Sequence, residues 1–155
     1  MRNRTLTVTF FIFIILFSCK KEEKTIEHDY LETIIDKLDV NDSIKRVVLL
    51  PGLGCHGCIQ EGEAFMKQNV TNRNILFILT QIESFKILQN KLEITLEEHP
   101  NVYIDKKNEI NFPTDNKVYP CIVMLDNGNV KGHEFQSPKN TAALQRLKKC
   151  IEMEL

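Results

Sequence analysis

The sequence contains no tryptophan, no block of basic residues, no internal repeat and no low-complexity tract. Its 20 Lys and Arg residues are nearly balanced by 21 Asp and Glu residues, which gives a formal net charge of −1. Proteins that bind nucleic acids gather positive charge to hold phosphates, so we expect no nucleic-acid partner. A chain of 155 residues that is 43% apolar predicts one globular domain with a real hydrophobic core.

A hydrophobic run long enough to span a bilayer is also missing. The run from Val8 to Phe17 is broken by Thr9, whereas a transmembrane helix needs about 20 apolar residues. The run follows two arginines and ends in LFSC, which resembles the lipobox of bacterial lipoproteins. The resemblance implies a signal peptide over residues 1–18, cleavage before Cys19 and lipid attachment to Cys19. A plain secretory signal or an uncleaved anchor is the alternative.

The residues after Cys19 begin with the charged run KKEEK. We expect residues 19–27 to form a tether and residues 28–155 to form the folded domain. Lipidation implies a location in the cell envelope, at the outer membrane or a periplasmic face, with the protein held by its lipid. Thiols oxidise readily outside the cytoplasm, so disulfide chemistry is available there.

Apolar periodicity and turn residues predict an alternation of helices and strands. The expected order is helix 28–38, strand 46–50, helix 55–69, strand 74–80, helix 84–94, strand 101–105, polar loop 106–117, strand 121–126, strand 129–135 and helix 137–155. Continuously apolar strands are typical of positions buried on both faces, and Asn127-Gly128 favours a tight hairpin. This order predicts an α/β fold, a mixed central sheet with helices on both faces.

The five cysteines fall into three groups. Cys19 is the candidate for lipidation, and Cys55 and Cys58 form the only close pair. Cys121 and Cys150 either pair with each other or act as small buried hydrophobes. We expect both to lie in the core, although Cys121 could also lie beside the close pair.

The close pair has the spacing CxxC and follows the predicted strand 46–50. Cys55 therefore lies at the beginning of a helix, where free N–H groups and the helix dipole stabilise a thiolate and lower the thiol pKa. Protonated His56 would stabilise the thiolate further. Cys58 lies one turn along and can close a small ring with Cys55. This arrangement predicts a reversible dithiol/disulfide couple.

A CxxC helix, then Pro120 before a buried strand, a hairpin at Gly128 and a last helix together resemble the thioredoxin-like family. The resemblance covers residues 44–152 and implies a thioredoxin-like fold. It implies that Cys55 attacks, that Cys58 resolves, and that the Tyr119–Pro120 bond is cis. Tyr119 would offer a backbone edge to an extended substrate. Gly54 stands where the family often has tryptophan.

The implied function is an extracytoplasmic thiol–disulfide oxidoreductase that needs no cofactor beyond its cysteines. Its substrates would be protein thiols and disulfides, and a membrane or periplasmic redox partner would recycle the pair.

Two other functions stay open from the sequence. Cys55 and Cys58 could bind Cu(I) or Zn(II), with His56, His133 or Cys121 completing the site. Structural zinc normally takes four ligands and only one CxxC is present, so we predict no metal site. We expect His133 to lie in solvent. The other alternative is a lipoprotein scaffold without catalytic activity.

Overall fold

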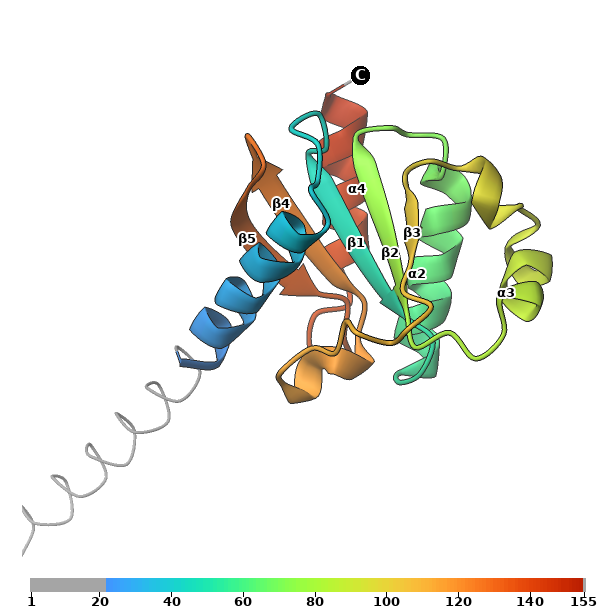
Figure 1. Cartoon of the computed structure of the whole chain (residues 1–155), viewed down its shortest axis with the longest axis horizontal. Helices are drawn as coiled ribbons and strands as arrows, with labels where there is room; N and C mark the ends of the chain where they lie inside the picture. The colour runs from blue at the N-terminus through green and yellow to red at the C-terminus, as the bar shows by residue number, and fades with distance from the viewer. Residues whose placement is uncertain (1–21, 155) are drawn as a thin grey trace, which may run out of the picture.

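A computed structural model describes residues 22–154, and its centre is one five-stranded sheet (Figure 1). The strands are β1 (Arg46–Pro51), β2 (Ile75–Thr80), β3 (Val102–Ile104), β4 (Cys121–Asp126) and β5 (Asn129–Phe135). Their order across the sheet is β3-β2-β1-β4-β5. The first three strands are parallel, and β4 is antiparallel to both of its neighbours. The predicted mixed sheet is confirmed.

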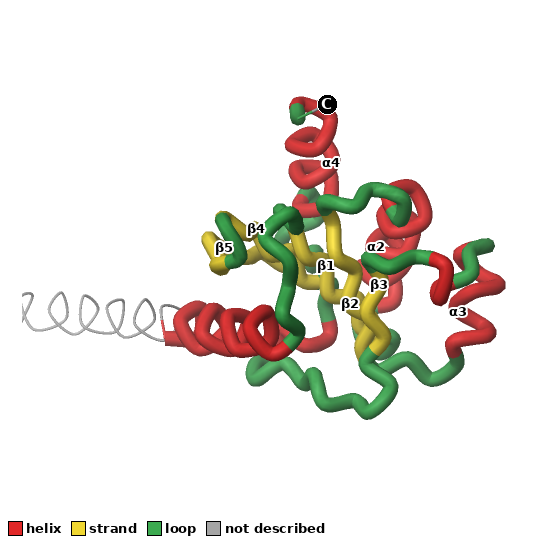
Figure 2. Tube along the Cα trace, turned by 45° about the horizontal axis from the view of Figure 1, so that its top comes forward, coloured by secondary structure: helices red, strands yellow, loops and turns green. Residues whose placement is uncertain are grey.

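Helices cover both faces of this sheet (Figure 2). The named helices are α2 (His56–Asn69), α3 (Phe85–Leu92), α4 (Ala143–Met153) and two short 3-10 helices, η1 (Leu96–Glu98) and η2 (Asp115–Val118). An N-terminal helix over residues 22–37 lies on the face opposite α2 and α4. This division follows from the alternation of side chains along buried strands.

Two apolar cores result, one on each face. The first joins α2, α3 and α4 to the sheet through residues such as Phe65, Met66 and Phe77. The second joins the N-terminal helix and the 106–117 loop to the sheet through residues such as Leu31 and Ile78. The central strands β1 and β2 contribute to both cores, which explains their unbroken apolar sequences.

The N-terminal helix begins earlier than the sequence predicts. It includes residues 22–27, which we expected to form a tether, and Glu27 is only 4% exposed. The helix therefore extends into the segment that we expected to form a tether, and Glu27 has polar partners in distant parts of the chain. The predicted signal peptide and Cys19 lie outside the described residues. No helix within residues 22–154 is long and apolar enough to cross a membrane.

The 106–117 segment is a folded loop rather than a solvated one. The Asp105 carboxylate accepts hydrogen bonds from the backbone N–H groups of Glu109 and Ile110, at 3.1 and 2.7 Å. These bonds turn the chain back over the sheet, where Ile110 and Phe112 are buried in the second core. The loop ends in η2, which leads directly to Pro120 and β4.

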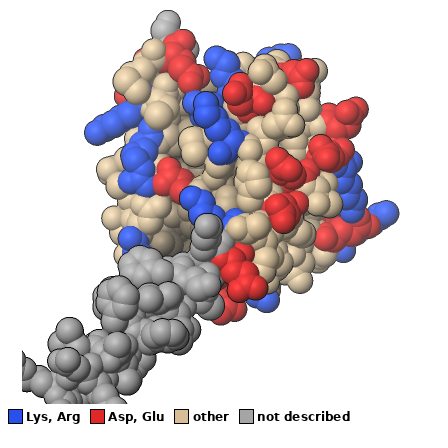
Figure 3. Space-filling model, turned by 90° about the vertical axis from the view of Figure 1, so that its left-hand side faces the viewer, with Lys and Arg blue, Asp and Glu red and all other residues tan. Residues whose placement is uncertain are grey.

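The surface carries charges of both signs. On the face shown in Figure 3, Lys and Arg side chains lie mainly toward the left of the view and Asp and Glu side chains mainly toward the right. Some charged side chains of the described residues are paired, as Lys37 and Glu109 are at 2.7 Å.

Candidate dithiol–disulfide site

Cys55 and Cys58 are joined by a disulfide at the junction of β1 and α2. Their Cα atoms are 5.4 Å apart, within the ordinary range for a disulfide. β1 ends at Pro51 and α2 begins at His56, so the pair lies just beyond the carboxyl end of a central parallel strand. Crevices at this end of a parallel sheet are frequent binding and catalytic sites.

The two cysteines differ in their exposure to solvent. Cys55 is half-buried, whereas Cys58 is only 7% exposed. Cys55 is the N-cap of α2, and its carbonyl accepts the first helical hydrogen bond from Ile59 at 2.9 Å. The helix begins with N–H groups that have no intrahelical acceptor, and these stabilise an anion at the N-cap. The more exposed cysteine is therefore also the one whose thiolate, in the reduced protein, the helix N-terminus would stabilise. His56 follows it and is exposed.

A backbone contact connects this loop to the segment before β4. The N–H of Cys55 donates a hydrogen bond of 3.0 Å to the carbonyl of Val118. Gly54 makes the approach possible, because a Cβ at this position would lie 2.3 Å from the Val118 oxygen. Gly54 also has φ +144°, a backbone conformation that residues other than glycine rarely adopt. The local backbone thus requires a glycine at position 54.

Pro120 lies beside the disulfide-bearing helix. A Cβ on Gly62 would lie 3.2 Å from the Cγ atom of Pro120, so the proline packs against the second turn of α2. The Tyr119–Pro120 bond is trans, and our prediction of a cis bond is wrong. Tyr119 has the extended backbone, φ −116° and ψ 146°, that residues before a trans proline favour. Tyr119 is itself half-buried.

Pro120 is also bonded to Gln136, a residue that is only 2% exposed. The backbone N–H of Gln136 donates to the Pro120 carbonyl at 2.9 Å. Its side-chain amide donates to the Glu61 carboxylate on α2 and to the Thr141 carbonyl, and it accepts from the N–H of Leu144. One buried amide therefore links β5, α2 and the beginning of α4. No local signal in the sequence distinguishes this glutamine.

A groove opens beside the CxxC loop on the side of the β2–α3 connection. It has a volume of about 370 Å³ and includes Leu53, which is 50% exposed. The other lining residues are Gln81, Ile82, Glu83, Asn108 and Asn111. The groove offers apolar and polar contacts, and one of its lining residues, Leu53, is two residues before Cys55 in the sequence.

Cys121 lies in the second core, as predicted, and is only 1% exposed. Its partner across the antiparallel pairing is Leu49 on β1. Burial, with smaller contributions from the carboxylates of Glu27 and Glu134, raises the pKa of the Cys121 thiol well above its ordinary value. This thiol therefore stays protonated and buried. Cys150 is half-buried on α4, and neither cysteine forms a disulfide.

His133 is buried, which overturns our expectation that it lies in solvent. Its side chain is 3% exposed, and Nε2 lies 2.9 Å from the Oε2 atom of Glu27. The opposite nitrogen, Nδ1, is buried and has no hydrogen-bond partner. The histidine becomes buried because alternation along β5 turns it toward the N-terminal helix, against the ring of Phe135.

The candidate metal ligands do not gather around the cysteines. Cys55 and Cys58 are bonded to each other, and His133 is paired with Glu27. Within the described part of the chain, no group of three or more His, Cys, Asp or Glu side chains could hold a metal ion.

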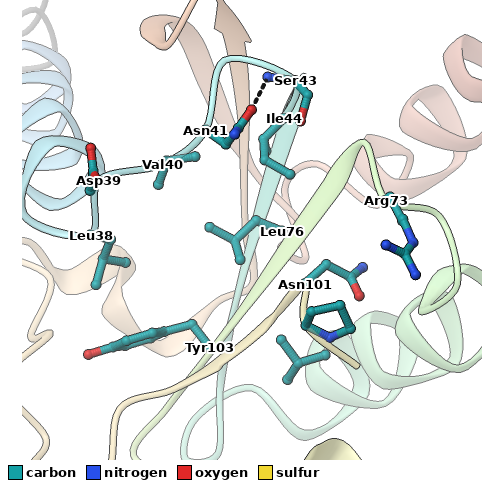
Figure 4. A pocket seen from close by; sticks show the side chains of 12 residues that line it. Leu38, Asp39, Val40, Asn41, Ser43, Ile44, Arg73, Leu76, Asn101 and Tyr103 are labelled. Atoms are coloured by element: carbon teal, nitrogen blue, oxygen red, sulfur yellow. Dashed lines mark hydrogen bonds between the residues drawn. The ribbon is translucent and has the colours of Figure 1, made fainter. Parts of the chain in front are cut away.

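A larger groove lies at the opposite end of the sheet (Figure 4). It has a volume of about 490 Å³, with Leu76 of β2 at its floor and Arg73 and Tyr103 at its sides. The loop that precedes β1 forms the remaining wall and is turned by a hydrogen bond from the N–H of Ser43 to Asn41, at 2.8 Å. The groove contains no cysteine or histidine.

No protein-family model matches the chain, and comparisons with curated proteins and with solved structures also find no match.

Proposed function

We propose that this protein is a thiol–disulfide oxidoreductase of thioredoxin-like fold that works through Cys55 and Cys58. One observation carries the proposal: the disulfide joins a half-buried Cys55 at a helix N-terminus to a buried Cys58. This asymmetry suits an attacking and a resolving sulfur. The strand order and the position of Pro120 support the fold assignment, whereas the trans Tyr119–Pro120 bond departs from the family pattern.

The reaction balances as two thiol–disulfide exchanges. In the reducing direction, the Cys55 thiolate attacks one sulfur of a substrate disulfide, forms a mixed disulfide and releases the other sulfur as a thiolate. The Cys58 thiol then loses its proton and attacks the Cys55 sulfur. The second substrate thiol leaves, and the protein retains the Cys55–Cys58 disulfide. Two electrons have passed to the substrate, and a partner dithiol must return them. The oxidising direction is the reverse.

The extended segment at Tyr119 would hold a substrate chain next to the disulfide. The groove at Leu53 borders the same loop. Both would bind the polypeptide around the reacting cysteine, while His56 is exposed beside Cys55 and would stabilise its thiolate when protonated.

The location belongs to the same proposal. Lipid on Cys19 would hold the protein at a membrane of the cell envelope, and a membrane or periplasmic dithiol protein would recycle it. Mass spectrometry of the purified protein tests this directly. Lipid-modified Cys19 at the N-terminus is expected, and an unmodified chain that begins at another residue would contradict the assignment.

Trapping of mixed disulfides tests the activity. Cys58→Ser removes the resolving thiol, so substrate proteins should remain bound to Cys55 and should be released by a reducing agent. Cys55→Ser is the matched control and should trap far fewer, because the buried Cys58 is poorly accessible. The wild-type protein should also reduce or oxidise a model protein substrate. Absence of turnover together with equal trapping by both variants would contradict the proposal.

A further inference from the structure

Glu27 is the centre of a buried polar cluster. Its members are distant in the sequence from Cys55 and Cys58. The Oε1 atom of Glu27 accepts hydrogen bonds from the Thr114 hydroxyl at 2.7 Å and from the Asn116 amide at 2.6 Å. Its Oε2 atom lies 2.9 Å from Nε2 of His133. Three elements therefore meet at one carboxylate: the N-terminal helix, η2 and β5.

Burial of the Glu27 carboxylate costs free energy. Glu27 is 4% exposed, and a charge removed from water is tolerated only when hydrogen bonds replace its hydration. Apolar contacts from Leu31, Ile34 and Ile35 already attach the helix to the sheet. The additional bonds from Thr114 and Asn116 are directional, and directional bonds hold a segment in one position.

The segment that Glu27 holds is the one that contacts the disulfide loop. Thr114 is the N-cap of η2, and its hydroxyl accepts a hydrogen bond from the N–H of Asn116 at 3.3 Å. The N–H of Tyr119 donates to the carbonyl of Asn116 at 3.0 Å. Between these residues lies Val118, whose carbonyl receives the N–H of Cys55. Hydrogen bonds at both ends of the short segment 114–119 therefore connect Glu27 to Cys55 through the covalent chain of that segment.

We propose that Glu27 is a positioning residue for the Cys55–Cys58 pair and acts through the 114–118 segment. The inference rests on the proposed oxidoreductase function. In the disulfide form the covalent bond itself restrains Cys55. In the dithiol form, the contact with Val118 is what keeps the Cys55 sulfur near Cys58. Loss of that restraint lowers the effective concentration of one thiol toward the other and makes the disulfide easier to reduce.

The equilibrium of the pair with glutathione measures this effect. For Glu27→Ala, we expect the equilibrium to shift toward the dithiol by about tenfold, which corresponds to about 30 mV for a two-electron couple. Glu27→Gln keeps an oxygen that accepts from Thr114 and Asn116, so it should restore the equilibrium to near the wild-type value. Both variants lose the negative charge. A shift that is equal in the two variants would therefore indicate an electrostatic effect and overturn the positioning role.

Glu32→Ala is the matched control on the same helix. The Glu32 side chain is 48% exposed, and its carboxylate lies 3.6 Å from Nε2 of His28, four residues away. This variant should keep the wild-type equilibrium. A folded Glu27→Ala protein with the wild-type equilibrium would overturn the proposal.

A second variant covers the case in which Glu27→Ala does not fold. Thr114→Val with Asn116→Ala removes both donors to Oε1 and keeps the contact between Glu27 and His133. It should shift the equilibrium in the same direction, and an unchanged equilibrium would overturn the proposal. Failure of the oxidoreductase function is a separate result: the wild type would equilibrate with glutathione but turn over no protein substrate.

Discussion

The N–H of Cys55 and the carbonyl of Val118 are joined by a hydrogen bond of 3.0 Å. These residues are far apart in the chain, and their contact attaches the loop that carries the disulfide to the segment before β4. Gly54 leaves room for this bond because it has no Cβ. Pro120, two residues after Val118, packs on Gly62. The position of Cys55 therefore depends on the segment before β4 as well as on its own helix.

Gly54→Ala should destabilise the protein, because Gly54 has φ +144° and its Cβ would clash with the Val118 oxygen. Strained backbone of this kind costs about 1–3 kcal/mol, and the clash adds to that cost. Denaturant unfolding of the oxidised protein measures the loss. Gly57→Ala is the matched control, since a Cβ there meets nothing within 4 Å. It should raise stability by about 0.5–1 kcal/mol, because Gly57 lies in a helix. Equal stabilities of the two variants would contradict this account.

The sheet is predictable from the sequence because its signals are local. The continuously apolar segments 46–50, 74–80 and 121–126 correspond closely to the observed β1, β2 and β4. Asn127 and Gly128 have the positive φ values, 50° and 79°, that a tight hairpin needs. The junction of β1 with the CxxC helix also follows from local patterns, and so the positions of Cys55 and Cys58 could be predicted.

The polar contacts around the site could not be predicted in the same way. Glu27 belongs to a charged stretch that is typical of a solvated tether, and its hydrogen-bond partners lie 87 to 106 residues away. Gln136 and His133 are likewise buried by contacts with distant elements. Tertiary partners decide whether such a polar side chain is buried, and no periodicity in one sequence reports them. The cis prediction at Pro120 came from the family resemblance alone, and the backbone contradicts it.

The reduced protein should react with iodoacetamide at Cys55 before any other described cysteine. Cys55 is half-buried at a helix N-terminus, whereas Cys58 and Cys121 are only 7% and 1% exposed. The thiolate is the reacting form, and both access and the helix N-terminus favour it at Cys55. Cys150 is an internal control, because it is also half-buried but lies near the end of α4. Peptide mapping at short reaction times should find Cys55 labelled at least tenfold faster than Cys121. Labelling of Cys121 at the rate of Cys55 would contradict the buried position.

Gln136→Leu should destabilise the protein although it replaces a polar side chain in a buried position. The substitution leaves the N–H of Leu144 and the carbonyl of Thr141 without the partner that the glutamine amide provides. An unsatisfied buried polar group costs about 1–3 kcal/mol, so the denaturant midpoint should fall clearly. Gln89→Leu is the control: Gln89 bonds to Glu97 on the exposed surface, at 3.0 Å. Its substitution should change stability by less than about 0.5 kcal/mol. A Gln136→Leu protein as stable as the wild type would show that the network contributes little.

The buried thiol of Cys121 should make stability fall in alkaline solution. Burial holds its pKa well above the ordinary value of 9.0. Below that value the thiol is protonated in both the folded and the unfolded chain, and its contribution to stability is constant. Above it the unfolded chain releases a proton that the folded protein keeps. The free energy of unfolding therefore decreases as pH rises, by up to about 1.4 kcal/mol per pH unit.

Comparison of Cys121→Ala with its parent isolates this contribution. Both proteins should carry Cys55→Ser and Cys58→Ser, which prevents thiol–disulfide exchange in the unfolded chain. Burial also raises the pKa of Tyr30, but that residue is common to both proteins, and its effect cancels in the difference. Urea unfolding at a series of pH values should show a constant difference below pH 9. Above pH 9 the parent should lose stability faster than Cys121→Ala, and parallel curves through pH 10 would mean that the thiol is not held protonated by the core.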